Sequence, residues 1–219
     1  MIEDRTLYGV EVNGKEFTSF NIEEGIPCGD GKATLDISTT PYTLTLDNAE
    51  ILTNDSYGIM TDGQSLNIVL IGENSIDGQD IGIYCRDQDV TITGNGNLTV
   101  SASSMYLGSV YARNIVFKNE GNITFYDEED SPHSGTVVGR GSVTFAGSGN
   151  VDVTSLYEPA VDATVDVIFS GKGEVSLKGY THYNLGSAVN ADGSILLNGE
   201  NRKITLGSTG ESTCVTKAT

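Results

Sequence analysis

Apolar and polar residues alternate in short bursts along this chain, and the bursts recur at a regular interval. Seven segments begin with an alternating strand signal, at Leu44, Leu66, Val90, Ile115, Val143, Val167 and Ile195. Successive starts are separated by 22, 24, 25, 28, 24 and 28 residues. A self-similar period in this range predicts a solenoid, in which each unit buries its apolar face against its neighbours.

Each unit continues with two further pairs of alternating apolar residues. The second pair follows a short polar turn, at Leu98/Val100, Ile123/Phe125, Val151/Val153, Val175/Leu177 and Ile204/Leu206. The third pair follows a more variable loop, at Ile59/Thr61, Ile83/Cys85, Val110/Ala112, Val137/Gly139, Val161/Ala163 and Val189/Ala191. Three strands per unit predict an all-β fold, a right-handed parallel β-helix (a three-sheet β-solenoid) of about seven coils.

The inward positions of such a helix form ladders, because coils stack about 4.8 Å apart. Phe117, Phe145 and Phe169 are expected to stack in consecutive coils and to fill the narrow core. Cys85 and Cys214 also fall on inward positions, which predicts buried thiols too far apart for a disulfide. The chain has 3 cysteines and no Cys-x-x-Cys pair, so a zinc site is not predicted.

The start of the chain lies outside this period. Residues 1–41 are predicted to form an N-terminal β cap and lead-in, and residues 42–219 the parallel β-helix. Asn13-Gly14 is typical of a hairpin turn. A cap is expected because the open end of a β-helix exposes unpaired strand edges. We expect the opening Met1–Arg5 to replace a removed signal peptide, and other domains of a larger surface protein to flank this one.

The stretch "GNGNLTV" at 94–100 resembles the opening of a phosphate-binding loop. Its counterparts "NEGNITF", "GSGNVDV" and "GKGEVSL" lie between the first and second strands of their own units. A phosphate loop ends at a helix N-terminus and does not recur in every repeat, whereas here a strand follows each time. We therefore interpret the glycines as corner residues with backbone angles that other residues adopt only with strain, and exclude a nucleotide site.

Composition narrows the possible ligands. The chain carries 30 acidic and 12 basic residues, for a formal net charge of -18. Such a field repels phosphate backbones and anionic lipid, so neither nucleic-acid binding nor membrane binding is expected. No apolar run is long enough for a membrane-spanning helix. The same field attracts cations, Ca²⁺ among them.

Particular motifs point to a family. They are "YTLTLDNAEI", repeated third strands of the pattern GI-x-x-(x)DG and "VTITGNGNLTV". In these motifs the chain resembles the carbohydrate-binding β-helix proteins of gut and cellulolytic bacteria, whose fold is similar to that of pectate lyases. The resemblance covers residues 34 to 206. It implies a secreted or cell-surface protein, a right-handed helix, Ca²⁺ as a ligand and no catalysis, with acidic plant polysaccharide and cellulose as ligands of some members.

A catalytic interpretation requires paired carboxylates across the scissile bond. Asp127, Glu128, Glu129 and Asp130 are adjacent in one hydrophilic loop, not on neighbouring strands. The Asn-Thr-Asp, Asp-Asp and Gly-His-Gly motifs that a resemblance to polygalacturonases would require are absent. We therefore expect no enzyme activity. The four carboxylates are a candidate Ca²⁺ site, with a solvated loop tip as the alternative that we favour.

The outward side of the third strand carries the first candidate ligand site. Tyr84 and Tyr111 occupy one outward column, and Arg86, Arg113 and Arg140 occupy the next in three consecutive units. Guanidinium groups beside aromatic rings suit a carboxylated polysaccharide. The alternative is that Asp87, Asp89 or the 127–130 run neutralises the arginines.

The variable loop before the third strand carries the second candidate. Tyrosines recur in it, at Tyr57, Tyr106, Tyr126, Tyr157, Tyr180 and Tyr183. Sugars stack their apolar faces on such rings, and loops on a rigid scaffold often bind ligands. The alternative is that the rings cover the core at a corner, with their hydroxyls in water.

Together these features predict non-catalytic polysaccharide binding by a secreted or surface β-helix module. Ca²⁺ is the one candidate cofactor. Two other functions stay open. One is an adhesin or structural surface stalk, in which the helix supplies length. The other is a polysaccharide lyase or hydrolase, which the missing motifs disfavour.

Overall fold

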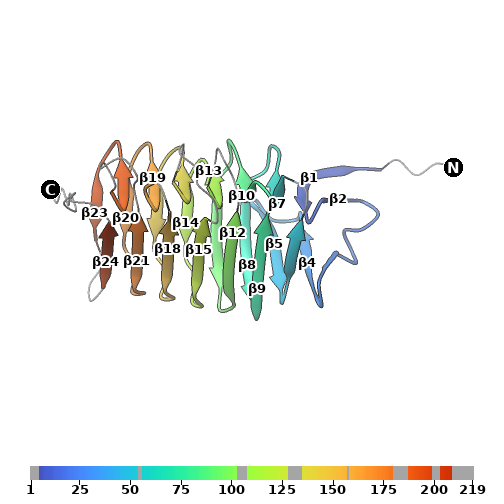
Figure 1. Cartoon of the computed structure of the whole chain (residues 1–219). Helices are drawn as coiled ribbons and strands as arrows, with labels where there is room; N and C mark the ends of the chain where they lie inside the picture. The colour runs from blue at the N-terminus through green and yellow to red at the C-terminus, as the bar shows by residue number, and fades with distance from the viewer. Residues whose placement is uncertain are drawn as a thin grey trace.

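The computed structural model describes residues 5–53, 56–102, 108–127, 135–156, 158–179, 187–198 and 203–208. Every element in these ranges is a β-strand, and the strands form three sheets that run the length of the molecule. Figure 1 shows the coils side by side along one axis, with the N-terminal strands at one end and the last strands of the chain at the other. The predicted parallel β-helix is therefore confirmed.

Each coil contributes one strand to each sheet. Sheet B holds the first strand of each coil, β5 (Tyr42–Asp47), β8 (Leu66–Ile71), β11 (Val90–Gly94), β14 (Ile115–Phe117), β17 (Val143–Phe145), β20 (Val167–Phe169) and β23 (Ile195–Leu197). Sheet C holds the second, β6 (Glu50–Thr53), β9 (Glu73–Gly78), β12 (Asn97–Ala102), β15 (Ile123–Asp127), β18 (Val151–Ser155), β21 (Val175–Gly179) and β24 (Ile204–Ser208). Sheet A holds the third, β7 (Tyr57–Thr61), β10 (Ile81–Cys85), β13 (Val110–Ala112), β16 (Val137–Gly139), β19 (Val161–Ala163) and β22 (Val189–Ala191).

The strands β5 to β22 make six complete turns, and β23 with β24 begins another. The prediction of about seven coils thus counts a last turn whose third strand, with Cys214, lies outside the described residues. Neighbouring coils pair in parallel and in register, as Ile83 with Val110 and Val110 with Val137. In-register pairing keeps every second side chain of each coil inside, because side chains alternate along a strand.

The core is a narrow column of stacked side chains. Phe117, Phe145 and Phe169 are buried, with ring centroids 5.0 Å and 5.1 Å apart and interplanar angles of 18° and 10°. The predicted phenylalanine ladder is confirmed. Cys85 is buried as predicted, and burial raises the pKa of its thiol to about 12. A thiol with that pKa stays protonated and unreactive at neutral pH.

Antiparallel strands close the N-terminal end. The strands β1 (Leu7–Val12) and β2 (Lys15–Thr18) form a hairpin whose turn residues Asn13 and Gly14 both have positive φ, at 53° and 68°. The strand β1 pairs antiparallel with β7, and β4 (Gly31–Asp36) pairs antiparallel with β3 (Ile26–Cys28) and β5. The first coil is therefore paired in sheets A and B, and these sheets end in the short strands β2 and β3, which limits unwanted strand addition.

The corner glycines between sheets B and C do not all serve the purpose predicted for them. Gly94 has φ 99°, the left-handed region that glycine adopts without strain. Gly96 has no such angle; a Cβ there would lie 2.7 Å from the carbonyl oxygen of Gly72 in the preceding coil. The prediction from backbone angles was thus wrong for Gly96, where glycine is needed because adjacent coils approach too closely for a side chain.

Candidate functional site

Three tyrosine rings form a stack on the outward face of sheet A. Tyr57 and Tyr84 have ring centroids 4.7 Å apart, and Tyr84 and Tyr111 have centroids 5.6 Å apart, with interplanar angles of 13° and 21°. Tyr84 pairs in register with Tyr111, and both rings are half-buried. Tyr84 points outward because its chain neighbours, Ile83 and Cys85, point inward. Burial raises the pKa of Tyr84, while the nearby Arg86 lowers it.

The stack differs from the prediction in one member. Tyr57 was predicted in the variable loop, but it lies in β7, and its ring packs against Tyr84. The rings cover each other's faces, so the middle ring presents its edge and hydroxyl, not a flat face, to a ligand. The stack ends at Tyr111. The next residue of the same column, Val138, pairs in register with Tyr111 and is buried.

A hollow of about 310 Å³ adjoins this stack. Its lining combines one aromatic wall with amide, hydroxyl, carboxylate and guanidinium groups, from Thr61, Asp62, Gly63, Tyr84, Arg86, Asp87 and Gln88. The residues come from the ends of β7 and β10 and from the turns that follow these strands. The structure therefore brings together two of the predicted ligand residues, Tyr84 and Arg86, in one concave surface.

Two of the three predicted ladder arginines are neutralised by acidic side chains. Arg113 binds Asp89 through two contacts, Nε to Oδ1 and Nη2 to Oδ2, both 2.8 Å. Arg140 Nη1 lies 3.4 Å from Asp87 Oδ1. Within the described residues no carboxylate lies within ion-pair distance of Arg86. The alternative interpretation thus holds for Arg113 and Arg140, whereas Arg86 has no such carboxylate partner in the part of the chain that the structure describes.

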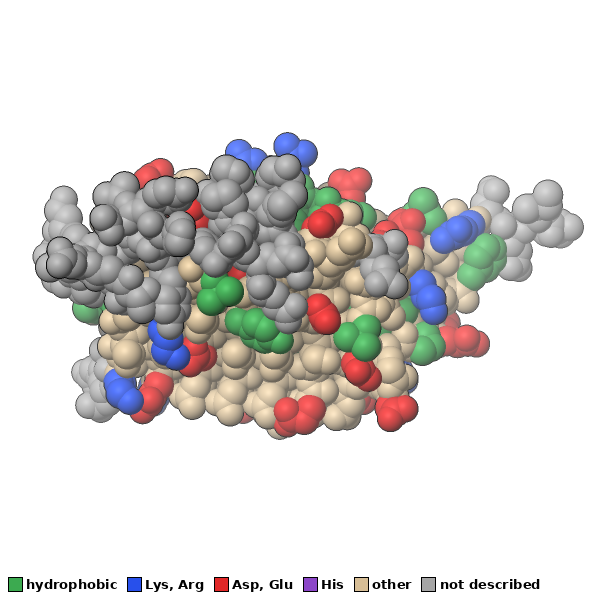
Figure 2. All heavy atoms as spheres, in the orientation of Figure 1, with side chains coloured by type: hydrophobic (Ala, Val, Ile, Leu, Met, Phe, Trp, Pro, Cys, Tyr) green, Lys and Arg blue, Asp and Glu red, His purple; other side chains and the backbone are tan. Residues whose placement is uncertain are grey.

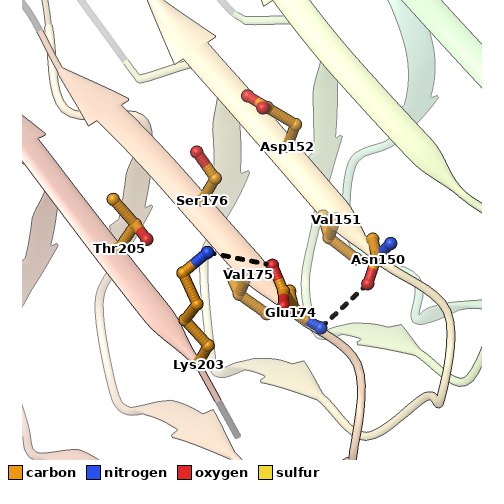
Figure 3. Close-up of a pocket in the computed structure, with 8 residues that line it drawn as sticks. All are labelled: Asn150, Val151, Asp152, Glu174, Val175, Ser176, Lys203 and Thr205. Carbon is orange, nitrogen blue, oxygen red and sulfur yellow. Dashed lines mark hydrogen bonds and ion pairs between the residues drawn. The ribbon is translucent and has the colours of Figure 1, made fainter.

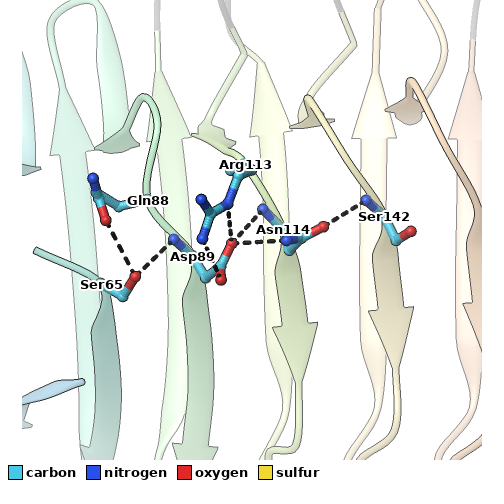
Figure 4. Close-up of polar contacts among 6 residues, drawn as sticks. All are labelled: Ser65, Gln88, Asp89, Arg113, Asn114 and Ser142. Atoms are coloured by element: carbon cyan, nitrogen blue, oxygen red, sulfur yellow. Dashed lines mark hydrogen bonds and ion pairs between the residues drawn. The ribbon is translucent and has the colours of Figure 1, made fainter. Parts of the chain in front are cut away.

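Asp89 is also part of a polar ladder at the corner between sheets A and B (Figure 4). Ser65 Oγ accepts a hydrogen bond from Asp89 N at 3.1 Å, Asp89 Oδ1 accepts one from Asn114 N at 3.2 Å, and Asn114 Oδ1 accepts one from Ser142 N at 2.9 Å. The Arg113 guanidinium lowers the pKa of Asp89, with further help from Asn114. The sequence signal that could have revealed this ladder is a short polar residue directly before each sheet-B strand from β8 to β23.

Asp127 is the only member of the predicted metal cluster that lies in the described residues, and it is half-buried. Ser109 Oγ donates to Asp127 Oδ1 at 3.0 Å, and Thr136 Oγ1 donates to Oδ2 at 2.5 Å. Burial raises the pKa of Asp127, and these hydroxyl donors lower it. Among the described residues no three His, Cys, Asp or Glu side chains form a group that could hold a metal ion.

The remaining predicted residues divide into two groups. Tyr126 was assigned to a loop, which was wrong: it lies in β15, where it points outward from sheet C because Phe125 points inward. The others lie outside the described residues, namely Tyr106, Glu128, Glu129, Asp130, Tyr157, Tyr180 and Tyr183. The loop tyrosines and the Ca²⁺ site therefore stay predictions.

Acidic side chains are spread over several parts of the face drawn in Figure 2 and do not gather in one patch. The described part of the chain contains no helix with the length and hydropathy that a membrane span needs. Comparison with protein-family models, curated proteins and solved structures finds no match to this chain.

Proposed function

We propose that this protein is a non-catalytic carbohydrate-binding module, and that an uncharged polysaccharide binds at the hollow on sheet A. The observation that carries the proposal is the juxtaposition of Tyr84, Arg86 and Gln88 around a hollow of about 310 Å³. Ligand pockets begin at about 300 Å³ and combine aromatic surface with a few fixed polar groups. A polysaccharide ligand implies action outside the cell, so a secreted or surface location is part of the proposal.

The charges favour a neutral ligand over a carboxylated one. Asp89 and Asp87 already bind Arg113 and Arg140, so one of the three ladder arginines stays available. The formal net charge of -18 repels a polyanion before it reaches that arginine. Sugar hydroxyls, in contrast, both donate and accept hydrogen bonds, and Arg86, Gln88 and Asp62 supply both kinds of partner.

The carboxylates of the hollow do not favour catalysis. Glycoside hydrolysis needs one carboxylic acid held protonated, which requires burial away from water. The side chain of Asp87 is 72% exposed and is paired with Arg140, and Asp62 is also exposed. Neither residue has the environment of a general acid, which supports a binding function over a hydrolase.

Affinity electrophoresis tests this proposal. Native gels would contain hydroxyethyl cellulose, galactomannan, xylan or polygalacturonate, each with Ca²⁺ or with chelator. We expect at least one neutral polymer to retard the wild-type protein, and Arg86→Ala to lose most of that retardation. Arg113→Ala is the matched control, because it removes an arginine of the same column whose partner, Asp89, does not line the hollow, and it is expected to migrate like wild type.

Three results would contradict the proposal. Retardation by none of these glycans would favour a structural stalk. Retardation by polygalacturonate alone, dependent on Ca²⁺, would replace the neutral ligand with an acidic one. Release of reducing ends or of unsaturated product from any polymer would show an enzyme.

A further inference from the structure

A second hollow, of about 280 Å³, lies on the outward face of sheet C (Figure 3). It spans β18, β21 and β24, far along the chain from the hollow on sheet A. Val151, Val175 and Ile204 pair in register in these strands. The residues on either side of them therefore form two rows across three coils, one of Asn150, Glu174 and Lys203, and one of Asp152, Ser176 and Thr205.

Two ion pairs border this hollow. Lys203 Nζ lies 3.3 Å from Glu174 Oε2, and Lys178 Nζ lies 3.6 Å from Asp152 Oδ2. Ser176 lies between the two pairs, and its short side chain leaves the floor open. The four charges sum to zero, which is unusual in a chain with a formal net charge of -18. A balanced site neither attracts nor repels by net charge, so it suits a neutral ligand.

The strands set the spacing of the polar rows, and one hydrogen bond joins neighbouring coils at the rim of the hollow. Asn150 Oδ1 accepts a hydrogen bond from Glu174 N at 3.0 Å, which ties one coil to the next at the rim. The rows present ammonium donors, carboxylate acceptors and hydroxyl groups at the spacing of the strands, about 4.8 Å. A ligand with many hydroxyl groups can satisfy both kinds of partner at once.

An aromatic side chain lies on the same face of sheet C, in the strand next to β18, but outside the lining of the hollow. Tyr126 in β15 pairs in register with Thr154 in β18, and both point outward from sheet C because Phe125 and Val153 are buried. Tyr126 is half-buried and thus keeps part of its ring exposed.

We propose that the hollow on sheet C is a second saccharide-binding site, which makes the module bivalent. The inference rests on the proposed function, since it assigns the same class of ligand to a second surface. Sheets A and C form different sides of the coil, so the two hollows face different directions. Two separate chains, or two distant segments of one chain, would occupy them, and the protein would cross-link a polysaccharide.

Variants that disable each hollow separately test the inference. Ser176→Ile and Thr205→Ile place branched side chains on the floor of the sheet-C hollow, at positions in β-strands where such residues fit. Thr144→Ile is the matched control, because Thr144 points outward from sheet B between Val116 and Ile168 and lines neither hollow. Arg86→Ala disables the sheet-A hollow. Circular dichroism would check that all variants keep the wild-type strand content.

Two measurements separate binding from bivalency, both with the neutral polymer that retards the wild-type protein. Bivalent attachment strengthens apparent affinity, so Ser176→Ile/Thr205→Ile is expected to weaken gel retardation about tenfold, and the further addition of Arg86→Ala to abolish it. Wild-type protein is expected to make solutions of the long polymer turbid by cross-linking, and Ser176→Ile/Thr205→Ile to bind without turbidity. Thr144→Ile should behave as wild type in both assays.

The outcomes distinguish the two proposals. If wild-type protein is retarded and Ser176→Ile/Thr205→Ile matches it in both assays, the second site is wrong and the proposed function stands. The same conclusion follows if Arg86→Ala alone removes all retardation. If no polymer retards wild-type protein, the proposed function itself fails, and the second site fails with it.

Discussion

Two stacks of aromatic rings run along this molecule, one inside the coil and one outside it. Phe117, Phe145 and Phe169 have centroids 5.0 Å and 5.1 Å apart, and the outward tyrosine stack has centroids 4.7 Å and 5.6 Å apart. The in-register coils impose this geometry on the phenylalanines and on Tyr84 and Tyr111. Tyr57 pairs in register with Ile81, and its ring reaches Tyr84 from three positions earlier in its strand. Stacking alone therefore says nothing about function; the difference lies in burial and in the groups that surround each stack.

The largest expected effect on stability comes from a substitution in the inner phenylalanine stack. Phe145→Ala removes the middle ring, which is in contact with both neighbours, and leaves a cavity in a fully buried position. The free energy of unfolding should fall by about 4 kcal/mol, as for other buried phenylalanines. Urea unfolding followed by circular dichroism measures this change. Phe145→Leu, which keeps most of the volume, should cost clearly less; an equal loss in both variants would show that the missing ring, and not the cavity, sets the cost.

A smaller effect on stability is expected at the polar ladder between sheets A and B, where Asp89 joins two coils on the outside of the helix. Asp89→Ala removes the acceptor for Asn114 N and both contacts with Arg113, and should lower the free energy of unfolding by about 1.5 kcal/mol. The folded state lowers the pKa of Asp89, so its stabilising contribution is present above the unfolded pKa of about 3.9. It is lost as the pH falls through the folded value.

Asp89→Asn tests that pH dependence, because it removes the charge and keeps one acceptor oxygen. The difference in melting temperature between wild type and this variant should be largest at neutral pH and should close in acid. A difference that stays constant down to the acid limit of folding would rule out the Asp89–Arg113 pair as its source.

The outer stack should matter less for stability than for binding. Tyr84→Ala removes a half-buried ring with a stacked ring on each side and should cost about 1 kcal/mol in unfolding free energy. The same variant should lose most of the retardation by a neutral polysaccharide. Tyr84→Phe keeps the stack and removes the hydroxyl, so it separates ring packing from hydrogen bonding. A loss of stability as large as that of Phe145→Ala would erase the contrast between the two stacks.

The smallest expected effect is at Asp127, where the sign of the pH dependence is reversed. The folded state raises the pKa of Asp127, so its favourable contribution is present below the unfolded pKa and is lost as the pH rises through the folded value. Asp127→Asn abolishes this titration and keeps one acceptor for Ser109 or Thr136. Thermal melts from pH 4 to 8 should show wild type losing stability relative to Asp127→Asn as the pH rises, by a few tenths of a kcal/mol. The opposite trend would contradict the burial of a charged carboxylate.

The interior and the exterior of the coil were not equally predictable. Alternation and period identified the three sheets, the inward phenylalanines and the buried Cys85, because the inward positions obey one rule in every coil. They also placed Tyr84 and Tyr111 in one outward column. They misplaced Tyr57 and Tyr126, because the boundary between a strand and a variable loop has no strict period.

The solenoid and the alternation of inward and outward side chains can be read from the sequence, since both follow from the spacing of apolar residues and from the repeat. The tertiary structure decided what those outward side chains do. Arg113 binds an aspartate 24 positions earlier, and Arg140 binds one 53 positions earlier. Outward partners come from neighbouring coils and turns whose side-chain positions no local pattern encodes. Only the folded coil therefore shows that Arg113 and Arg140 are paired, and that Arg86, beside Tyr84, has no carboxylate partner among the described residues.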